Sequence, residues 1–200
     1  MDCWHCGHEM PDAADFCPRC GHTARERGSS PIFVVDSSTD LFNAVFIEAM
    51  IGQEANRAMR YRRPLSVLVV EVDHADNIRQ ELAPDQLARL LAELGHALVE
   101  AVRDTDTAGF LDARHSPLFA VVLPEADAPS AIQAADNLRR SISSRDFLDR
   151  GPWQRLTVSV GAATLNHERM GQQQLLKEAH SALLSGRELG PNRTFATASV

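Results

Sequence analysis

The stretch Leu65–His74 constrains the fold of this chain more strongly than any other part of the sequence. Apart from Ser66 and Glu71, its first eight residues are apolar and mostly β-branched, which is typical of a strand buried on both faces of a sheet. Glu71 and Asp73 lie near its carboxyl end, two residues apart and therefore on one face of the strand. Because ligands of open α/β sheets bind beyond the carboxyl ends of such strands, we expect a functional site there.

The patterns on either side of this strand predict an α/β (α+β) fold, a mixed sheet flanked by helices. In the helix before the strand, Phe42, Val45, Phe46, Met50 and Ile51 recur at helical spacing, and Pro64 is expected to end it. Apolar periodicity and turn residues place the other elements. We expect helices at 41–61, up to 82, 84–102, 127–142 and 172–184, and strands at 65–74, 110–111, 118–123, 156–165 and 194–198.

The composition is that of a globular protein, with 44% hydrophobic and 24% charged residues in a chain of 200. A net charge of −7 disfavours binding to nucleic acid, which requires a basic surface. No apolar run approaches the ~20 residues of a membrane span, so we expect no membrane association. The amino terminus lacks the basic and apolar regions of a secretory signal, and we therefore expect a cytoplasmic location.

The cysteines form two near copies of one motif, Cys3-Trp-His-Cys6-Gly-His and Cys17-Pro-Arg-Cys20-Gly-His. Two thiolates three residues apart bind one metal ion, and the following glycine tolerates the tight turn that this requires. Together Cys3, Cys6, Cys17 and Cys20 predict a closed tetrahedral zinc site with a structural role, at residues 1–22. The alternative is two redox or disulfide pairs, which a cytoplasmic location disfavours.

This amino-terminal segment resembles the zinc ribbons that are often placed ahead of bacterial signalling domains. Some zinc ribbons bind nucleic acid and others bind proteins, and the acidic balance of this chain favours a protein. Residues 23–35 are expected to be a linker, because Thr23–Pro31 is polar and ends in Gly, Ser and Pro. The main domain is then expected at 36–198.

Several motifs of the main domain occur in an order and spacing that together are specific. They are Thr39-Asp-Leu-Phe-Asn43, Arg63-Pro-Leu65, Glu71-Val-Asp73-His74, Phe119-Ala-Val-Val-Leu-Pro124, Val158-Ser-Val-Gly-Ala162 and Gly190-Pro-Asn192. With these motifs, residues 36–197 resemble the GGDEF domains of diguanylate cyclases. The resemblance implies a nucleotide-cyclase-like sheet and, in active members, a homodimer that joins two GTP molecules into cyclic di-GMP with Mg²⁺.

The same resemblance implies that the catalytic site has degenerated. The signature hairpin Gly-Gly-Asp/Glu-Glu-Phe falls on His115, Ser116, Pro117, Leu118 and Phe119, so both glycines and both acids are replaced. Side chains at the glycine positions block the close approach of a triphosphate, and the lost acids remove ligands of Mg²⁺. The guanine-recognising and phosphate-binding positions of the family fall on Arg79, Ala88, Arg187 and Pro191. We therefore expect no catalytic residues.

Glu71 and Asp73, like the hairpin positions 115–118, are interpreted as vestigial active-site positions. Two acids at one strand end supply fewer ligands than a hard cation takes from protein and phosphate together. The favoured interpretation of these two acids is a solvated strand end or a cap on the following helix.

One further family feature is partly retained in Arg103-Asp-Thr-Asp106. It matches the Arg-x-x-Asp of the family's inhibitory site, where an arginine fork and a carboxylate bind cyclic di-GMP. Arg114 offers a second fork, although the spacing from Asp106 to the hairpin indicates an insertion of three residues. The alternative is an ordinary exposed ion pair between Arg103 and Asp106.

The favoured hypothesis is a catalytically inactive GGDEF-like signalling module that acts through protein contact. Its expected partner is a protein, either a second copy of itself or a homologous cyclase in a dimer, with cyclic di-GMP or GTP as a further ligand. Structural zinc is the expected cofactor. Two alternatives stay open: an active nucleotide cyclase, of the diguanylate or class III type, with a divergent site, and a nucleic-acid-binding zinc ribbon protein.

Overall fold

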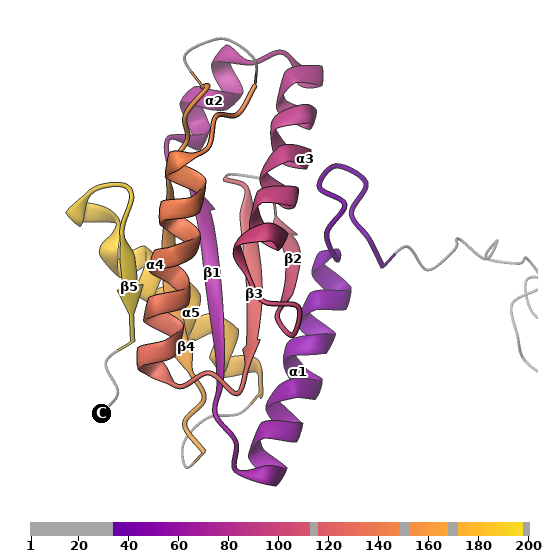
Figure 1. The fold of residues 1–200 in the computed structure, drawn as a ribbon, viewed down its shortest axis with the longest axis vertical. Helices are drawn as coiled ribbons and strands as arrows, with labels where there is room; N and C mark the ends of the chain where they lie inside the picture. The colour runs from indigo at the N-terminus through magenta and orange to yellow at the C-terminus, as the bar shows by residue number, and fades with distance from the viewer. Residues whose placement is uncertain (1–33, 113–115, 149–152, 168–171, 198–200) are drawn as a thin grey trace, which may run out of the picture. The chain divides into compact units, whose positions relative to one another are not determined.

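The computed structural model describes residues 34–112, 116–148, 153–167 and 172–197, without the side chains of residues 112, 172 and 173 (Figure 1). The chain divides into two units, Met1–Phe33 and Val34–Val200. The expected zinc ribbon at 1–22 and nearly all of the expected linker at 23–35 therefore lie outside the described residues. All of the described residues belong to the second unit.

The helices and strands of this unit follow one another in the order that the sequence predicts. The helices are α1 Ala44–Tyr61, α2 Ala75–Glu81, α3 Pro84–Ala101, α4 Ala128–Ser144 and α5 Gln172–Gly186, with a 3-10 turn η1 Arg187–Leu189 after α5. The strands are β1 Leu65–Val72, β2 Thr107–Asp112, β3 Leu118–Pro124, β4 Val158–Thr164 and β5 Thr194–Ala196. Among the described residues, no helix has the length and apolar character that crossing a bilayer requires.

β1 lies at the centre of a five-stranded sheet of order β2-β3-β1-β4-β5. It pairs antiparallel with β3 and β4, and β5 joins β4 in parallel at the edge. All eight residues of β1 are buried, which confirms the prediction of a strand covered on both faces. The acidic end of β1 is therefore held by neighbours on both sides.

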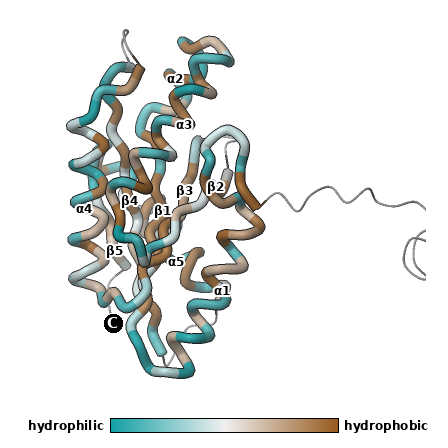
Figure 2. The backbone as a smooth tube through the Cα atoms, turned by 45° about the vertical axis from the view of Figure 1, so that its right-hand side comes forward, coloured by the Kyte–Doolittle hydropathy of each residue, from teal (hydrophilic) through white to brown (hydrophobic). Residues whose placement is uncertain are grey.

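Helices cover both faces of the sheet, so the core has two layers (Figures 1 and 2). On one face α3 and α4 bury Leu94, Leu98 and Leu138 against strand residues such as Val70 and Phe119. On the other face α1 and α5 bury a second cluster. Its members include Ile47, Ile51, Leu175 and Leu183 of the helices and Val67, Val69, Ala120 and Val122 of the strands.

α1 differs from its sequence prediction in the face that it buries. Its buried face is Ile47, Ile51, Ala55 and Ala58, whereas Val45, part of the predicted apolar pattern, is 80% exposed. Helical spacing identifies an apolar stripe on the helix, but it does not identify which residues of that stripe face the sheet. The helix ends at Tyr61, as the sequence predicts, and Arg62 after it takes a left-handed conformation (φ 51°) with its N–H bonded back to the Ala58 carbonyl.

β2 begins at Thr107, three residues earlier than the two-residue strand expected at 110–111. Gly109 interrupts the run of strand-forming residues from which the strand would be predicted, since glycine is a weak strand former. The fold explains why glycine stands at this position, because a Cβ at Gly109 would lie 2.5 Å from the Cβ of Ile47 in α1. Close packing of α1 on the sheet therefore requires glycine at this position.

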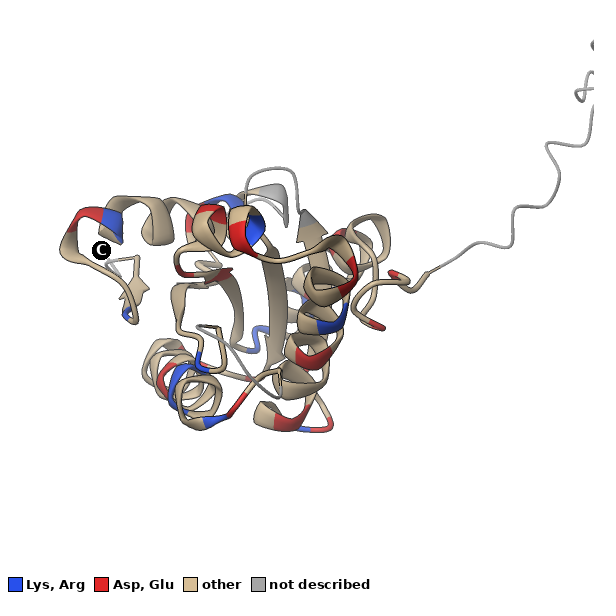
Figure 3. Cartoon of the chain, turned by 90° about the horizontal axis from the view of Figure 1, so that it is seen from above, with Lys and Arg blue, Asp and Glu red and all other residues tan. Residues whose placement is uncertain are grey.

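Charged residues are spread over the helices. Viewed from above in Figure 3, acidic and basic segments alternate along the helices, and the described residues form no continuous basic face in that view. This distribution agrees with the net charge of −7 in disfavouring a polyanion-binding surface.

Candidate functional site

A cavity of about 650 Å³ lies beyond the carboxyl end of β1, where the sequence predicts the functional site. Residues from several distant parts of the chain meet there. The lining includes Glu71, Asp73, His74, Asp76, Ser116, Arg187 and Gly190. The cavity therefore brings together the acidic strand end, the hairpin before β3 and the turn after α5.

Glu71 is buried, with 8% of the residue exposed, and its carboxylate is paired with Arg187. Arg187 Nε donates to one carboxylate oxygen at 3.2 Å, and Nη2 donates to the other. This forked, charge-assisted geometry is the strongest arrangement that an arginine makes with a carboxylate. Both oxygens of Glu71 are thus engaged by a residue 116 positions along the chain.

Asp73 is engaged even more completely. Its Oδ2 accepts hydrogen bonds from Thr157 Oγ1 at 2.6 Å and from the Asn192 backbone N–H at 2.8 Å. Its Oδ1 accepts one from Ser159 Oγ at 2.7 Å. The carboxylate of Asp73 therefore ties β4 and the loop before β5 to the end of β1.

The favoured interpretation of these two acids from the sequence is wrong. They are not a solvated strand end, because both carboxylates bond to protein groups. They do not cap the following helix either, since the N-cap of α2 is His74, in a left-handed conformation with no side-chain cap bond. Sequence reasoning did not assign Thr157, Ser159 and Asn192 to this site, because no pattern within one element links them to Asp73.

The hairpin positions lie on two sides of the sheet end. Ser116 reaches the cavity and its Oγ donates to the Val72 carbonyl at 3.4 Å. The Pro117 carbonyl accepts the Val72 N–H, and Leu118 pairs with Glu71 in the β1–β3 ladder. The Leu118 side chain lines a different cavity, beneath α1 and α5. His115 lies outside the described residues.

This donor set does not fit Mg²⁺, which takes carboxylate oxygens that are free to coordinate. The Glu71 and Asp73 oxygens are already occupied by a guanidinium, two hydroxyls and a backbone N–H. Within the described ranges, no three acidic, histidine or cysteine side chains gather as a metal site would require. The arrangement is one that stabilises the sheet end by internal hydrogen bonds.

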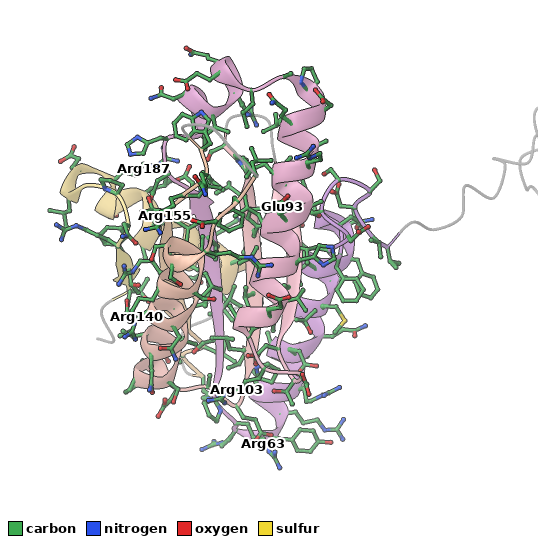
Figure 4. The ribbon with its side chains drawn as sticks, turned by 45° about the horizontal axis from the view of Figure 1, so that its top comes forward. Arg63, Glu93, Arg103, Arg140, Arg155 and Arg187 are labelled. Carbon is green, nitrogen blue, oxygen red and sulfur yellow. The ribbon has the colours of Figure 1, made fainter. Side chains whose placement is uncertain are left out.

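Arg103 and Asp106 meet in one tight turn between α3 and β2. The Arg103 backbone N–H donates to Asp106 Oδ2 at 3.0 Å, and the Asp106 N–H donates to the Arg103 carbonyl at 2.9 Å. The donor to the carboxylate is thus the backbone and not the guanidinium. Burial raises the pKa of the Asp106 carboxyl above its ordinary value, against the lowering effect of the Arg103 N–H and charge. In Figure 4, Arg103 lies at the opposite end of the sheet from Arg187, and Arg114 lies outside the described residues.

The strand order and the two helical layers define a mixed α/β domain with an acidic end on its central strand. The family model described as "Diguanylate cyclase, GGDEF domain" matches residues 33–193, and a model described as "zinc-ribbon domain" matches residues 3–23. The chain therefore belongs to the GGDEF domain family.

Relatives and solved structures agree with this assignment. The probable diguanylate cyclase DgcC of Escherichia coli (strain K12) is 28% identical over 163 residues, which cover 82% of this chain and 43% of DgcC. This chain thus spans less than half the length of that relative. The GGDEF domain of DgcB from Caulobacter crescentus, solved in complex with c-di-GMP, superposes with a TM-score of 0.74 at 19% identity, covering 91% of this chain and 100% of that one. Diguanylate cyclase SiaD of Pseudomonas aeruginosa, solved with its activator SiaC, gives 0.73 at 21% identity, covering 82% and 62%.

Proposed function

We propose that this chain is a GGDEF domain without catalytic activity, and that it acts as a regulatory module through contact with a protein. The single observation that carries this proposal is the engagement of the Asp73 carboxylate by three protein donors. In an active cyclase of this family, carboxylates of the site are expected to coordinate Mg²⁺, and the acidic end of this strand supplies two of them. Here a metal ion bound at Oδ1 would compete with the Ser159 hydroxyl, and one bound at Oδ2 would compete with the Thr157 hydroxyl and the Asn192 N–H.

The cost of such a displacement supports the proposal. A hydrogen bond to a charged group contributes about 1.5–3 kcal/mol, and a buried donor left without an acceptor costs about 1–3 kcal/mol. Glu71 would additionally have to leave the Arg187 fork. With Pro117 and Leu118 in place of the hairpin acids, the hairpin supplies no carboxylate to offset these losses.

Turnover of GTP by the purified full-length chain tests this proposal. With GTP and either Mg²⁺ or Mn²⁺, we expect no cyclic di-GMP by chromatography above a blank without protein, while an active diguanylate cyclase in parallel gives product. ATP with Mn²⁺ tests the class III alternative in the same way. Product formation that is lost in both Glu71→Gln and Asp73→Asn would refute the proposal.

The regulatory half of the proposal draws on the neighbours of the fold. SiaD was solved with an activator protein, so a GGDEF protein of this fold takes part in regulatory protein contacts. The proposed partner is a second copy of the chain or a homologous active cyclase. Adding this chain to an active cyclase from the same cell is expected to change its rate of cyclic di-GMP synthesis.

The zinc ribbon is proposed as a second docking element. The family match to residues 3–23 contains Cys3, Cys6, Cys17 and Cys20, which supply the four thiolates of a closed zinc site. Metal analysis of the purified chain is expected to find zinc, and Cys17→Ser is expected to lose it. Full retention of zinc by Cys17→Ser would contradict this ligand set.

Binding of cyclic di-GMP at Arg103 and Asp106 is a second candidate function, favoured by their meeting in one turn. The Asp106 carboxylate is held there by the Arg103 backbone N–H, and this bond does not occupy the Arg103 guanidinium. Calorimetry with cyclic di-GMP is expected to show binding that Arg103→Ala abolishes and Arg155→Ala, at a distant exposed arginine, preserves. The absence of binding by the unmodified chain would exclude this function.

A further inference from the structure

A second cavity, of about 940 Å³, lies between α1 and α5 on the face of the sheet that these helices cover. Its floor is apolar, formed by Val69, Leu111 and Leu118 of the strands, and Leu176 of α5 continues it. We call it the α1–α5 groove. It is separate from the strand-end cavity, with which it shares no lining residue.

The α1 wall of this groove has an unusual outward surface. Val45 is 80% exposed there, and Ala49 and Gly52 follow it at one-turn intervals along the same side of the helix. Gly52 stands in the interior of α1, where glycine costs about 1 kcal/mol relative to alanine. The three residues give α1 an exposed apolar knob beside a stretch where another helix can approach closely.

The two walls of the groove carry opposite charges. Glu48 lies on the α1 wall, while Lys177 and His180 lie on the α5 wall. Neither Glu48 nor Lys177 is buried, and neither forms an ion pair with another described residue. A surface with an acid on one wall and a base on the other is complementary to a copy of itself turned by a two-fold axis, because each charge then meets its opposite twice.

We propose that the α1–α5 groove is the interface of a homodimer. In it, Val45 of each copy enters the groove of the other, over Leu118 and Leu176, and Glu48 faces Lys177 of the partner subunit. A second copy fits this surface better than an unrelated protein, because the pattern of charges is its own complement. This inference does not depend on the proposed loss of catalysis, since neither Glu71 nor Asp73 takes part in it.

Sedimentation of the full-length chain over a range of concentrations tests the interface. We expect a monomer–dimer equilibrium whose dissociation constant rises at least about tenfold in Glu48→Lys and in Lys177→Glu, because each change places two like-charged pairs in the interface. Mixing these two variants is expected to restore the dimer, since both contacts then join a lysine to a glutamate. The double variant Glu48→Lys/Lys177→Glu is expected to restore it as well.

Val45→Asp tests the apolar contact, with Val99→Asp as its matched control. Val99 is 54% exposed on α3, on the opposite face of the sheet. We expect Val45→Asp to be monomeric and Val99→Asp to dimerise like the unmodified chain, with circular dichroism checking that each variant is folded. If Val45→Asp fails to fold, the mixing of the two charge variants decides the question.

A chain that stays monomeric up to its solubility limit would overturn the proposal. So would a dimer that both charge reversals leave unchanged, as expected for association through another surface. Failure of the mixed variants to associate would also refute the two-fold pairing of Glu48 with Lys177 of the partner subunit.

Discussion

Asp73 offers the sharpest test of the idea that the former catalytic end of the sheet has become a structural element. As a metal ligand, Asp73 would be dispensable for folding. In this structure, replacing Asp73 by alanine removes the acceptor of Thr157, Ser159 and the Asn192 N–H at once. The two interpretations therefore predict opposite effects on stability.

The size of the effect can be estimated from the three bonds. At about 1.5 kcal/mol each they total roughly 4–5 kcal/mol, and partial exposure of the donors reduces the expected loss in Asp73→Ala to about 2–4 kcal/mol. Asp73→Asn keeps one acceptor oxygen, and we expect it to lose about half as much. For a chain of this size, a loss of about 3 kcal/mol corresponds to a melting temperature lower by roughly 6–12 °C.

Urea unfolding followed by far-UV circular dichroism measures these differences at neutral pH. Asp76→Asn is the matched control, because Asp76 is an exposed carboxylate that lines the same cavity. We expect the control to change the free energy of unfolding by less than about 0.5 kcal/mol. If Asp73→Ala and Asp73→Asn are as stable as the control, the carboxylate is not structural, and the main support for an inactive site is lost.

Three further predictions concern other contacts. Arg187→Met is expected to lower the free energy of unfolding by about 1–2 kcal/mol, because it leaves buried Glu71 without its partner. Adding Glu71→Gln to this variant is expected to restore part of the lost stability. Additive effects of the two changes in a double-mutant cycle would contradict the pairing. Burial raises the pKa of Asp106, so its charged form disfavours the folded state at neutral pH and this penalty disappears as the pH falls below the pKa of the unfolded chain. Asp106→Asn keeps an acceptor for the Arg103 N–H and is therefore expected to be at least as stable as the unmodified chain in chemical denaturation at neutral pH. This gain in stability is expected to shrink at acidic pH. A gain that grows on acidification would contradict the raised pKa of Asp106. Gly161→Ala is expected to cost at least about 1–3 kcal/mol in the same assay, because the new Cβ would lie 2.1 Å from the Ala179 carbonyl oxygen in α5, and unchanged stability would show that α5 is free to move.

Local patterns in the sequence were enough to establish the elements and their order. The buried strand within Leu65–His74, the helical stripe of 84–102 and the hairpin before Leu118 all come from periodicity and turn residues, and the structure confirms them. The replacement of both acids in the hairpin is also visible without coordinates. These features could be predicted because each depends on residues within one element.

The role of the acids at the strand end, and the side of α1 that is free, depend instead on tertiary packing. The partners of Asp73 lie 84 to 119 residues away, and Arg187 lies 116 residues from Glu71, so no pattern within an element indicates these pairs. The exposure of Val45 is likewise set by how α1 docks on the sheet, where Gly109 admits Ile47. Packing across the sheet joins distant segments, and it therefore determines which groups the carboxylates of the site meet.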